Sequence, residues 1–404
     1  MSEVVNIGML PALIANDYRK NIKANKALKL EMSIAVDEHI DSLDRNSVFE
    51  NPVYMNTNLD KLLTRNITIE PPSHRASEKS IAFKQDSYDI IIDDGAIHRS
   101  PLVSWEQKEA ARIIDYFENH NYLQLYQNYI HANNTICDFA FLNTIGPVGV
   151  KVANNKRTSM SIYHRNSLSN LSCNTVIIDV GKNANASITE VFDCSNTALT
   201  KIIYIVRDNA KLHVDRYIKE GSTAHVIEST VVQFQRSSVN VDIRASSTDY
   251  CLQSFDVSSF HFCNTEISGI IKSGTDDSNI IITDIEHRGK NSTSAIDVRS
   301  VTDDTGMFSF KGSISILGDA TDTVAHMQNK NIQLSNSAKV FTEPKLDIFT
   351  KEVECTHGCT VSNLDQQELY YLHSRGIDQQ SAEKMLLNNF LGVTNYERLI
   401  PNFV

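Results

Sequence analysis

VGKNANASI, residues 180–188, and VRDNAKLHV, residues 206–214, follow the same design 26 residues apart. Each has a short polar turn, an alanine and a new run in which apolar and polar residues alternate. A turn and a strand that recur at a nearly constant period are typical of a β-solenoid. In that fold each coil buries its inner face by stacking on its neighbours. The two segments therefore predict stacked coils.

Alternation with period two extends outward from these segments, over about residues 146–361. VNVDIRA, residues 239–245, has valine and isoleucine on one face and polar residues on the other, and MFSFKGSISIL, residues 307–317, is similar. No proline lies between Pro147 and Pro344, as expected of stacked strands, because proline removes a ladder hydrogen bond. A β-sandwich is the competing interpretation, but about 200 residues of short strands exceed one ordinary sandwich.

Helical patterns precede this region. Residues 16–43 and 104–130 have helix formers with apolar spacing of three to four, and the second run starts with Ser104 as N-cap and Gln107 at N3. Between them, YDIIIDDGAIH, residues 88–98, predicts a hairpin with an Asp-Gly turn. We therefore expect a mostly helical N-terminal domain at 1–143 and a core domain at 144–361.

The helical period returns after residue 361. Asp365 and Asp378 are each followed by a short helical pattern, and Gly376 and Gly392 follow the last turns as helix stops. The sequence thus predicts a helical hairpin region at 362–404. It has too few apolar residues to form a domain alone, so it must dock on the solenoid or on another protein.

Composition excludes several classes of protein. The 404-residue chain has a formal net charge of −11, which argues against nucleic-acid binding because phosphate contacts need clustered lysine and arginine. No apolar run approaches the roughly 20 residues of a membrane span, and the N-terminus lacks a secretory pattern. Seven irregularly spaced cysteines indicate the reduced thiols of a cytoplasmic protein. The chain lacks a phosphate-binding loop, so it has no nucleotide site of its own.

ECTHGCTVSNLDQQELYYLHSRGI, residues 354–377, resembles the C-terminal motif of the SufB/SufD family, which belongs to the SUF iron–sulfur cluster assembly system. TEPKLDIFTKEVECTHG, residues 342–358, and NKNIQLSNSAKV, residues 329–340, are similar to upstream segments of that family. The Cys-x-His-Gly step favours the SufD branch, because the SufB branch usually has Glu-His-Glu there. Glu343 departs from the family, which has a lysine before the proline.

The resemblance implies a right-handed parallel β-helix flanked by N-terminal and C-terminal α-helical regions. It also implies a non-enzymatic scaffold subunit that pairs with SufB and docks the SufC ABC-type ATPase, with a homodimer when the chain is isolated. A transient iron–sulfur cluster would form at the SufB–SufD interface. The implied location is the cytoplasm, or a plastid in a eukaryote. The expected docking residues for partners are Leu369, Tyr370, Leu372, Arg375 and Gly376.

Cys355, His357 and Cys359 occupy alternate positions, so an extended backbone puts them on one face. Each step then spans roughly 6.6 Å and the outer pair about 13 Å. A disulfide needs Cα atoms within about 7 Å, so Cys355 and Cys359 should not bridge unless the strand breaks at Gly358. One metal could bind two neighbours among the three. From spacing alone, a buried strand with a hydrogen-bonded histidine fits equally well. The resemblance ranks His357 first as a ligand, Cys355 second and Cys359 last.

Two other functions fit a solenoid. Paired carboxylates such as Asp276-Asp277 and Asp303-Asp304 could be the catalytic acids of a β-helix carbohydrate-active enzyme. The residues around both pairs are, however, typical of solvated turns. A solenoid could also only organise other proteins. The other histidines, including His213 and His225, are expected to have surface or satisfied polar roles, and the other cysteines to be buried structural thiols.

Overall fold

The computed structural model describes residues 3–6, 55–57, 61, 66–69, 88–93, 96–99, 110–115, 148–166, 171–246 and 248–395. The predicted helix at 16–43 and most of the predicted N-terminal domain lie outside these residues. The boundaries of that domain therefore stay a prediction.

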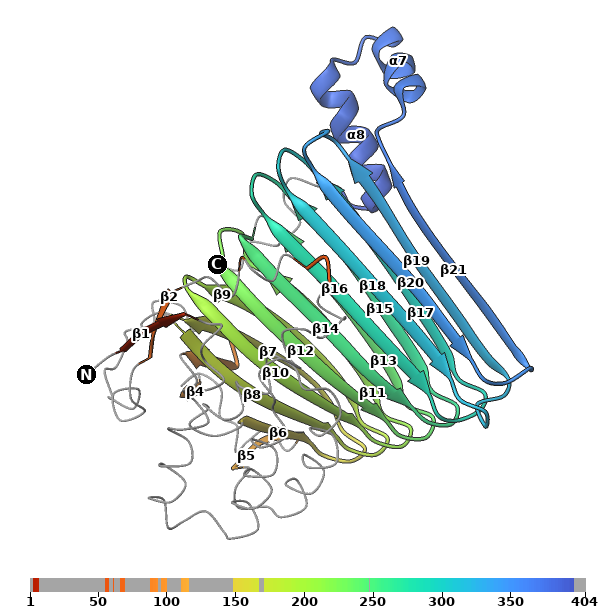
Figure 1. The fold of residues 1–404 in the computed structure, drawn as a ribbon. Helices are drawn as coiled ribbons and strands as arrows, with labels where there is room; N and C mark the ends of the chain where they lie inside the picture. The colour runs from red at the N-terminus through yellow and green to blue at the C-terminus, as the bar shows by residue number, and fades with distance from the viewer. Residues whose placement is uncertain are drawn as a thin grey trace.

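Two parallel sheets form the body of the molecule, and each coil gives one strand to each sheet (Figure 1). The chain makes about seven turns. One sheet contains β6 (Val148–Val152), β8 (Leu171–Val180), β10 (Thr197–Val206), β12 (Ala224–Gln233), β14 (Tyr250–Ser259), β16 (Ser278–His287), β18 (Met307–Ile316) and β20 (Lys339–Ile348). The other contains β7 (Arg157–Asn166), β9 (Asn185–Cys194), β11 (Lys211–Ile218), β13 (Ser238–Ser246), β15 (Asn264–Ser273), β17 (Thr293–Thr302), β19 (Thr323–Gln333) and β21 (Val353–Ser362). The predicted parallel β-helix is confirmed.

The space between the sheets is an apolar core of valine, isoleucine and phenylalanine. Val239, Val241 and Ile243 of β13 are each 1% exposed, while the residues between them are partly exposed, as the alternation predicted. Fully burying such a side chain contributes about 1.5–3 kcal/mol. Repeated burial along every coil is therefore what holds the stack together.

The turns between the two sheets repeat one backbone conformation. The same turn position has φ between 55° and 60° in seven turns, at Asn155, Asn183, Asn209, Arg236, Phe262, Asn291 and Asp322. Asparagine and aspartate tolerate this left-handed region, which explains the polar breaks in the sequence. The N–H of Asn183 donates to Asp208 O at 3.0 Å, and that of Asn209 to Gln235 O at 2.9 Å, so the hydrogen-bond ladder continues through the turns.

Short strands cover the N-terminal end of the solenoid. β3 (Ile90–Asp93) and β4 (Ala96–Arg99) form the predicted antiparallel hairpin, and β3 pairs with β7. β1 (Glu3–Asn6) pairs with β2 (Asn66–Ile69).

β5 (Ala111–Asp115) is a strand antiparallel to β6, where the helix at 104–130 was expected. The prediction of helix is wrong for these five residues. An open sheet edge offers backbone hydrogen bonds that outweigh a weak local helix propensity.

Two helices follow β21, as predicted: α7 (Gln366–Ser374) and α8 (Gln379–Leu391). Asp365 accepts hydrogen bonds from the N–H groups of Gln367 and Glu368, and Asp378 accepts one from that of Ser381, so both are N-caps.

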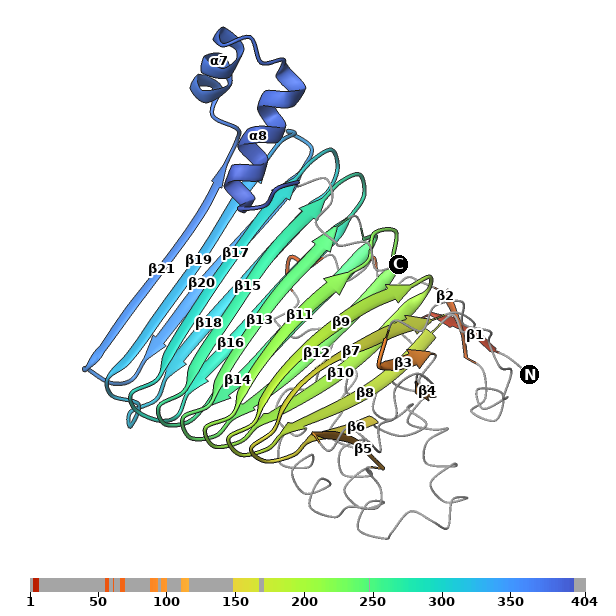
Figure 2. The same ribbon diagram turned by 180° about the vertical axis from the view of Figure 1, so that it is seen from behind.

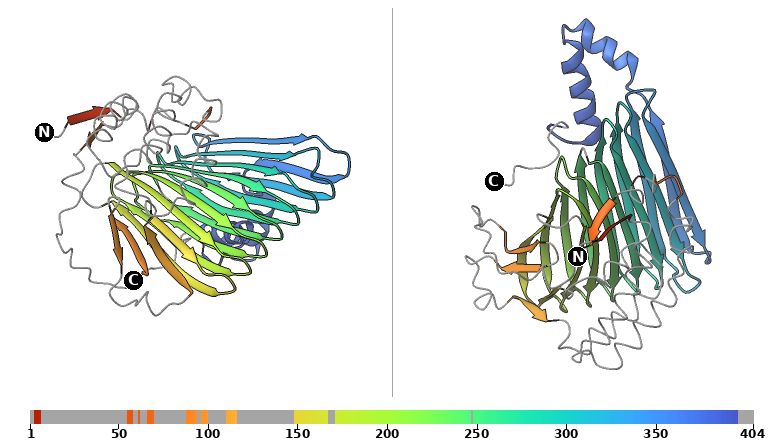
Figure 3. Two further views of the ribbon diagram at one scale, coloured as in Figure 1. Left: turned by 90° about the horizontal axis from the view of Figure 1, so that it is seen from below. Right: turned by 60° about the vertical axis from the view of Figure 1, so that its left-hand side comes forward.

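The apolar side of α8 docks on β17 and β19, where Leu387 and Leu391 pack against Val301 and Ile332. Figure 2 shows α8 against these strands from behind, and Figure 3 shows α7 projecting beyond the strand ends. Within the described part of the chain, neither helix is long and apolar enough to cross a membrane.

Candidate functional site

Cys355, His357 and Cys359 lie in β21, the last strand of the solenoid. The register places them next to Ala325, Met327 and Asn329 of β19, respectively, and all three β19 residues are buried between the sheets. The row formed by the two cysteines and the histidine therefore continues the inner face of the solenoid, and the predicted common face is confirmed. Because β21 is the terminal strand, both thiols are half-buried and His357 is exposed.

The two thiols of this row are free, as the spacing predicted. Burial, with a smaller contribution from the Glu354 carboxylate, raises the pKa of Cys355, although a hydrogen bond from the backbone of Ala325 lowers it. In the isolated chain this thiol is therefore protonated at neutral pH. Metal binding requires the thiolate, so a metal or a positive group brought by a partner must displace this proton.

The buried residues beneath the row fix its position. The side-chain amide of Asn331 donates to Thr360 O at 3.0 Å and to Asn329 Oδ1 at 2.7 Å, while Ser300 donates to Asn331 Oδ1 at 2.7 Å. This network anchors the strand next to Cys359. On the opposite sheet, a Cβ added to Gly312 would lie 2.5 Å from Met327 Sδ, so the glycine makes room for the methionine beneath His357.

The C-terminal end of the solenoid has unpaired strand edges. β20 and β21 each pair on one side only within the described residues. Exposed apolar side chains lie beside these edges: Ile348 is 42% exposed, Phe349 68% and Val361 46%. Unpaired edges with apolar neighbours are a hazard unless another chain covers them. This end is therefore an open and partly apolar surface.

The helical hairpin presents a second surface. Tyr370 is 76% exposed and Tyr371 56%, and the Arg375 guanidinium lies 5.1 Å from the centre of the Tyr371 ring. Of the predicted docking residues, Tyr370, Arg375 and Gly376 are exposed and Leu372 is partly exposed, but Leu369 is buried within the hairpin. Tyr371 was not among the predicted docking residues, although its position next to Tyr370 could have indicated it.

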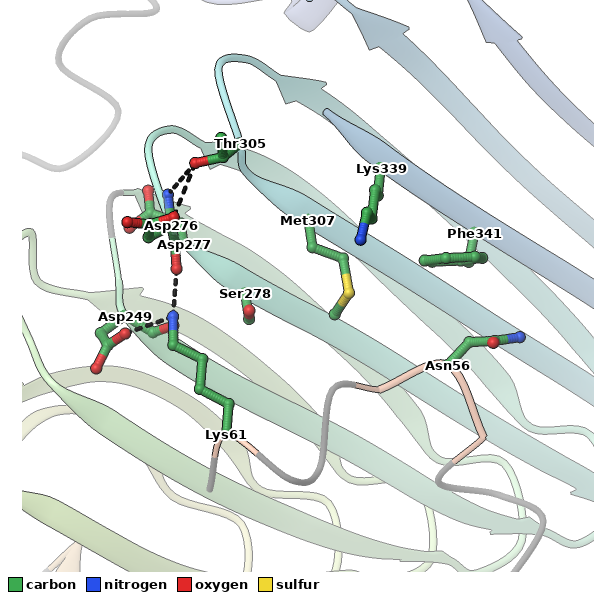
Figure 4. Close-up of a pocket in the computed structure, with 10 residues that line it drawn as sticks. All are labelled: Asn56, Lys61, Asp249, Asp276, Asp277, Ser278, Thr305, Met307, Lys339 and Phe341. Carbon is green, nitrogen blue, oxygen red and sulfur yellow. Dashed lines mark hydrogen bonds and ion pairs between the residues drawn. The ribbon is translucent and has the colours of Figure 1, made fainter. Parts of the chain in front are cut away.

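Asp276 and Asp277 line a pocket of about 550 Å³ with Lys61 and Asp249 (Figure 4). Lys61 Nζ is 2.5 Å from Asp249 Oδ1 and also donates to Asp276 O. Burial raises the pKa of Asp277, and the N–H of Gly274 donates to this carboxylate.

The carboxylates of two acid pairs hold neighbouring turns together. Thr305 donates to Asp276 Oδ1 at 2.8 Å, and Thr275 donates to Asp304 Oδ2 at 2.8 Å. The paired acids thus lie in hydrogen-bonded turns, as predicted, but the expected solvation is wrong for Asp277, which is buried.

Buried cysteines and histidines lie inside the coils. Cys173, Cys194, Cys251 and Cys263 are buried, as expected, and Cys137 lies outside the described residues. His225 is fully buried, and neither of its ring nitrogens has a hydrogen-bond partner among the described residues, so the expected satisfied role is wrong for it. Only the coil register, which the sequence does not show directly, places this histidine inside.

Comparisons with known proteins agree with the geometry. The family model described as "SUF system FeS cluster assembly, SufBD core domain" matches residues 163–390. The chain is similar to the iron–sulfur cluster assembly protein SufD of Escherichia coli (strain K12), with 37% identity over 92 residues, 23% of this chain and 22% of the relative.

Two further relatives are similar over a comparable share of the chain. An iron–sulfur cluster assembly SufBD family protein of Synechocystis is 34% identical over 94 residues, 23% of this chain and 21% of the relative. The chloroplastic protein ABCI7 of Arabidopsis thaliana is 31% identical over 90 residues, 22% of this chain and 19% of the relative. The aligned segments span about a fifth of the length of these three relatives.

Proposed function

The chain belongs to the SufBD core family and is SufD-like, and from this membership we propose that it is a non-enzymatic scaffold subunit of the SUF iron–sulfur cluster assembly complex. The observation that carries the proposal is the row of Cys355, His357 and Cys359 at the incomplete end of the solenoid. Thiolate and imidazole are the ligands that iron and its sulfide clusters take. The chain acts in the cytoplasm, or in a plastid if its host has one.

SufB is the partner that covers the solenoid end, across residues 340–361. The unpaired edges of β20 and β21 and the exposed Ile348, Phe349 and Val361 support this assignment. When SufB is missing, a second copy of the chain can cover the same surface.

The transient cluster forms at this interface and is later released from it. His357 supplies an exposed imidazole and Cys355 a thiol from the same face, and SufB supplies the remaining ligands. Neither subunit then holds a complete site alone, so separating the subunits releases the cluster. SufC supplies the ATP-driven motion, and it docks on the helical hairpin through Tyr370, Leu372 and Arg375.

The test is cluster content in the complex co-expressed with SufB and SufC. His357→Ala should leave complex formation intact and sharply reduce bound iron and sulfide, Cys355→Ala should be intermediate, and Cys359→Ala mild. His326→Ala, which changes an exposed histidine on the outer face of β19, is the matched control. A His357→Ala complex that purifies normally with wild-type iron and sulfide would show that the row is only part of a strand.

A further inference from the structure

Three metal-ligating side chains gather on the outer face of the solenoid, far along the chain from β21. His213 and Asp215 lie on β11 and Asp242 on β13, and one donor atom of each lies within 4.8 Å of the other two. His213 Nε2 is 3.2 Å from Asp215 Oδ2, and His213 Nδ1 is 3.9 Å from Asp242 Oδ2. All three side chains are partly exposed, so ions from solvent can reach them.

Hydrogen bonds outside this triad determine which nitrogen of His213 carries the proton. Asn240 donates its amide N–H to Glu266 Oε2 at 3.0 Å, so its carbonyl oxygen is the atom that faces His213 Nδ1 at 3.2 Å. That oxygen can only accept, so Nδ1 must donate a proton. In the neutral ring, Nε2 then turns a lone pair toward the Asp215 carboxylate. The 3.2 Å between these two acceptor atoms leaves a position between them that suits a cation.

The charges around the triad also favour a bound cation. Asp215 and Asp242 are direct register partners on neighbouring parallel strands, and like charges opposite one another are destabilising. Among the described residues, neither carboxylate has a lysine or arginine within ion-pair distance. The nearby Arg244 guanidinium lies over the Tyr217 ring instead, 5.9 Å from its centre. Within the described part of the chain, no lysine or arginine therefore forms an ion pair with these two carboxylates.

We propose that His213, Asp215 and Asp242 bind one divalent first-row transition-metal ion, which joins strands β11 and β13. One imidazole and two carboxylates form a nitrogen–oxygen set that suits Mn²⁺, Fe²⁺ or Zn²⁺. Donor atoms bound to one such ion lie at most about 4.4 Å apart, and one donor atom of each of these three side chains already lies within 4.8 Å of the others. Water completes the coordination on the exposed side. This site is separate from the row on β21, and it stands whether or not that row holds a cluster.

Mn²⁺ is the probe of choice because it prefers carboxylate and imidazole to the thiols of Cys355 and Cys359. Titration of the full chain at pH 7.5, followed by the loss of the free-ion electron paramagnetic resonance signal, should give one bound Mn²⁺ per chain. His213→Ala and Asp242→Asn should each weaken this binding at least tenfold. Bound Mn²⁺ should also raise the melting temperature of the wild type and not that of either variant.

The chain offers matched controls in the same rows of the same sheet. His326 shares the register row of His213, and Asp297 shares that of Asp215 and Asp242. His326→Ala and Asp297→Asn should bind Mn²⁺ as the wild type does, and Asp215→Asn is a second test variant if Asp242→Asn fails to fold. Equal binding by His213→Ala and the wild type would overturn the proposal. Absence of wild-type binding at millimolar Mn²⁺ would also overturn it.

Discussion

Arg216 is the largest fully buried side chain in the described residues, and its charge is balanced inside the core. Its Nε donates to Glu190 Oε2 at 2.9 Å, and its terminal nitrogen donates to Tyr204 Oη at 2.9 Å and to Ser229 Oγ at 3.0 Å. Phe255 places its ring 5.0 Å from the guanidinium. A buried pair with this many partners is costly to break, although it need not stabilise the fold more than apolar residues would.

Glu190→Gln should lower the free energy of unfolding by about 3–5 kcal/mol, because it leaves the Arg216 charge uncompensated in the core. Urea unfolding followed by circular dichroism measures this change. Lys182→Met is the control: it breaks an exposed pair with Asp208 and should cost at most about 1 kcal/mol. Equal decreases in the free energy of unfolding for the two variants would mean that water screens the buried ion pair.

Buried histidines should make stability depend on pH. Burial, aided by the nearby Arg216 and His225, lowers the pKa of His164 to about 3, and burial lowers the pKa values of His225 and His287 to about 4. An unfolded histidine titrates near about 6.5, so between this pH and about 4 the unfolded chain binds more protons. The stability that the neutral rings provide is therefore complete above about pH 6.5 and falls as the pH drops toward 4.

His164→Phe should flatten this dependence. Each such histidine steepens the fall in unfolding free energy by up to about 1.4 kcal/mol per pH unit. The phenylalanine can keep the stack on Phe192, where the ring centres are 4.2 Å apart. Urea midpoints between pH 7 and pH 4 measure the slope, and His326→Phe on the surface should keep the wild-type slope. An unchanged slope in His164→Phe would mean that water already solvates the buried ring.

Among the elements, those marked by local signals were predictable. The turn, alanine and alternating run at 180–188 recur because most of these turns combine a left-handed residue with a small buried residue after it; Ala184 and Ala210 are at most 1% exposed. The N-caps of α7 and α8 were also predictable, because each depends on residues close to it in the sequence. β5 was not predictable, since its pairing with β6 depends on an open sheet edge.

Contacts between coils could not be predicted from the sequence, for a related reason. Glu190 and Arg216 are register partners 26 residues apart, and Asp215 and Asp242 are partners 27 apart. Each separation equals one coil, but the number of residues per coil drifts along the chain. Register partners are 26 apart between β8 and β10 and 32 apart between β18 and β20. A search of the sequence for one fixed repeat length therefore does not align the coils correctly. It also does not reveal that the members of the candidate metal site lie side by side.

The joint between α7 and α8 can be tested through Gly376, which has φ +84° and donates its N–H to His373 O at 2.9 Å. Gly376→Pro should weaken SufC binding at least tenfold, because proline cannot reach positive φ and has no N–H. Gly376→Asn is the control, since asparagine tolerates this conformation. Isothermal titration with SufC gives the affinities. Full affinity in a folded chain that ends at residue 362 would show that SufC docks elsewhere.

At the scale of the whole molecule, the solenoid has two different ends. Short strands and the β3–β4 hairpin cover the first end, while the last end presents the open edges of β20 and β21. Phe349→Asp should therefore reduce SufB binding at least tenfold, because a charge would be buried where an apolar side chain is exposed now. Pull-down and light scattering measure pairing with SufB and with itself. Tyr370→Ala, on the helical hairpin, should leave both kinds of pairing unchanged, and wild-type pairing in Phe349→Asp would place the partner on another face.

The open end also has a consequence for how protection against hydrogen exchange is distributed. In a stack where each coil contacts only its neighbours, an inner coil is stabilised by two interfaces and the terminal coil by one. Backbone amides in β20 and β21 therefore open more often than those of the middle coils and exchange with solvent sooner. Cys355, His357 and Cys359 lie in this least protected coil. A partner that adds the missing interface should slow exchange there first, so that β21 becomes ordered as the partner binds.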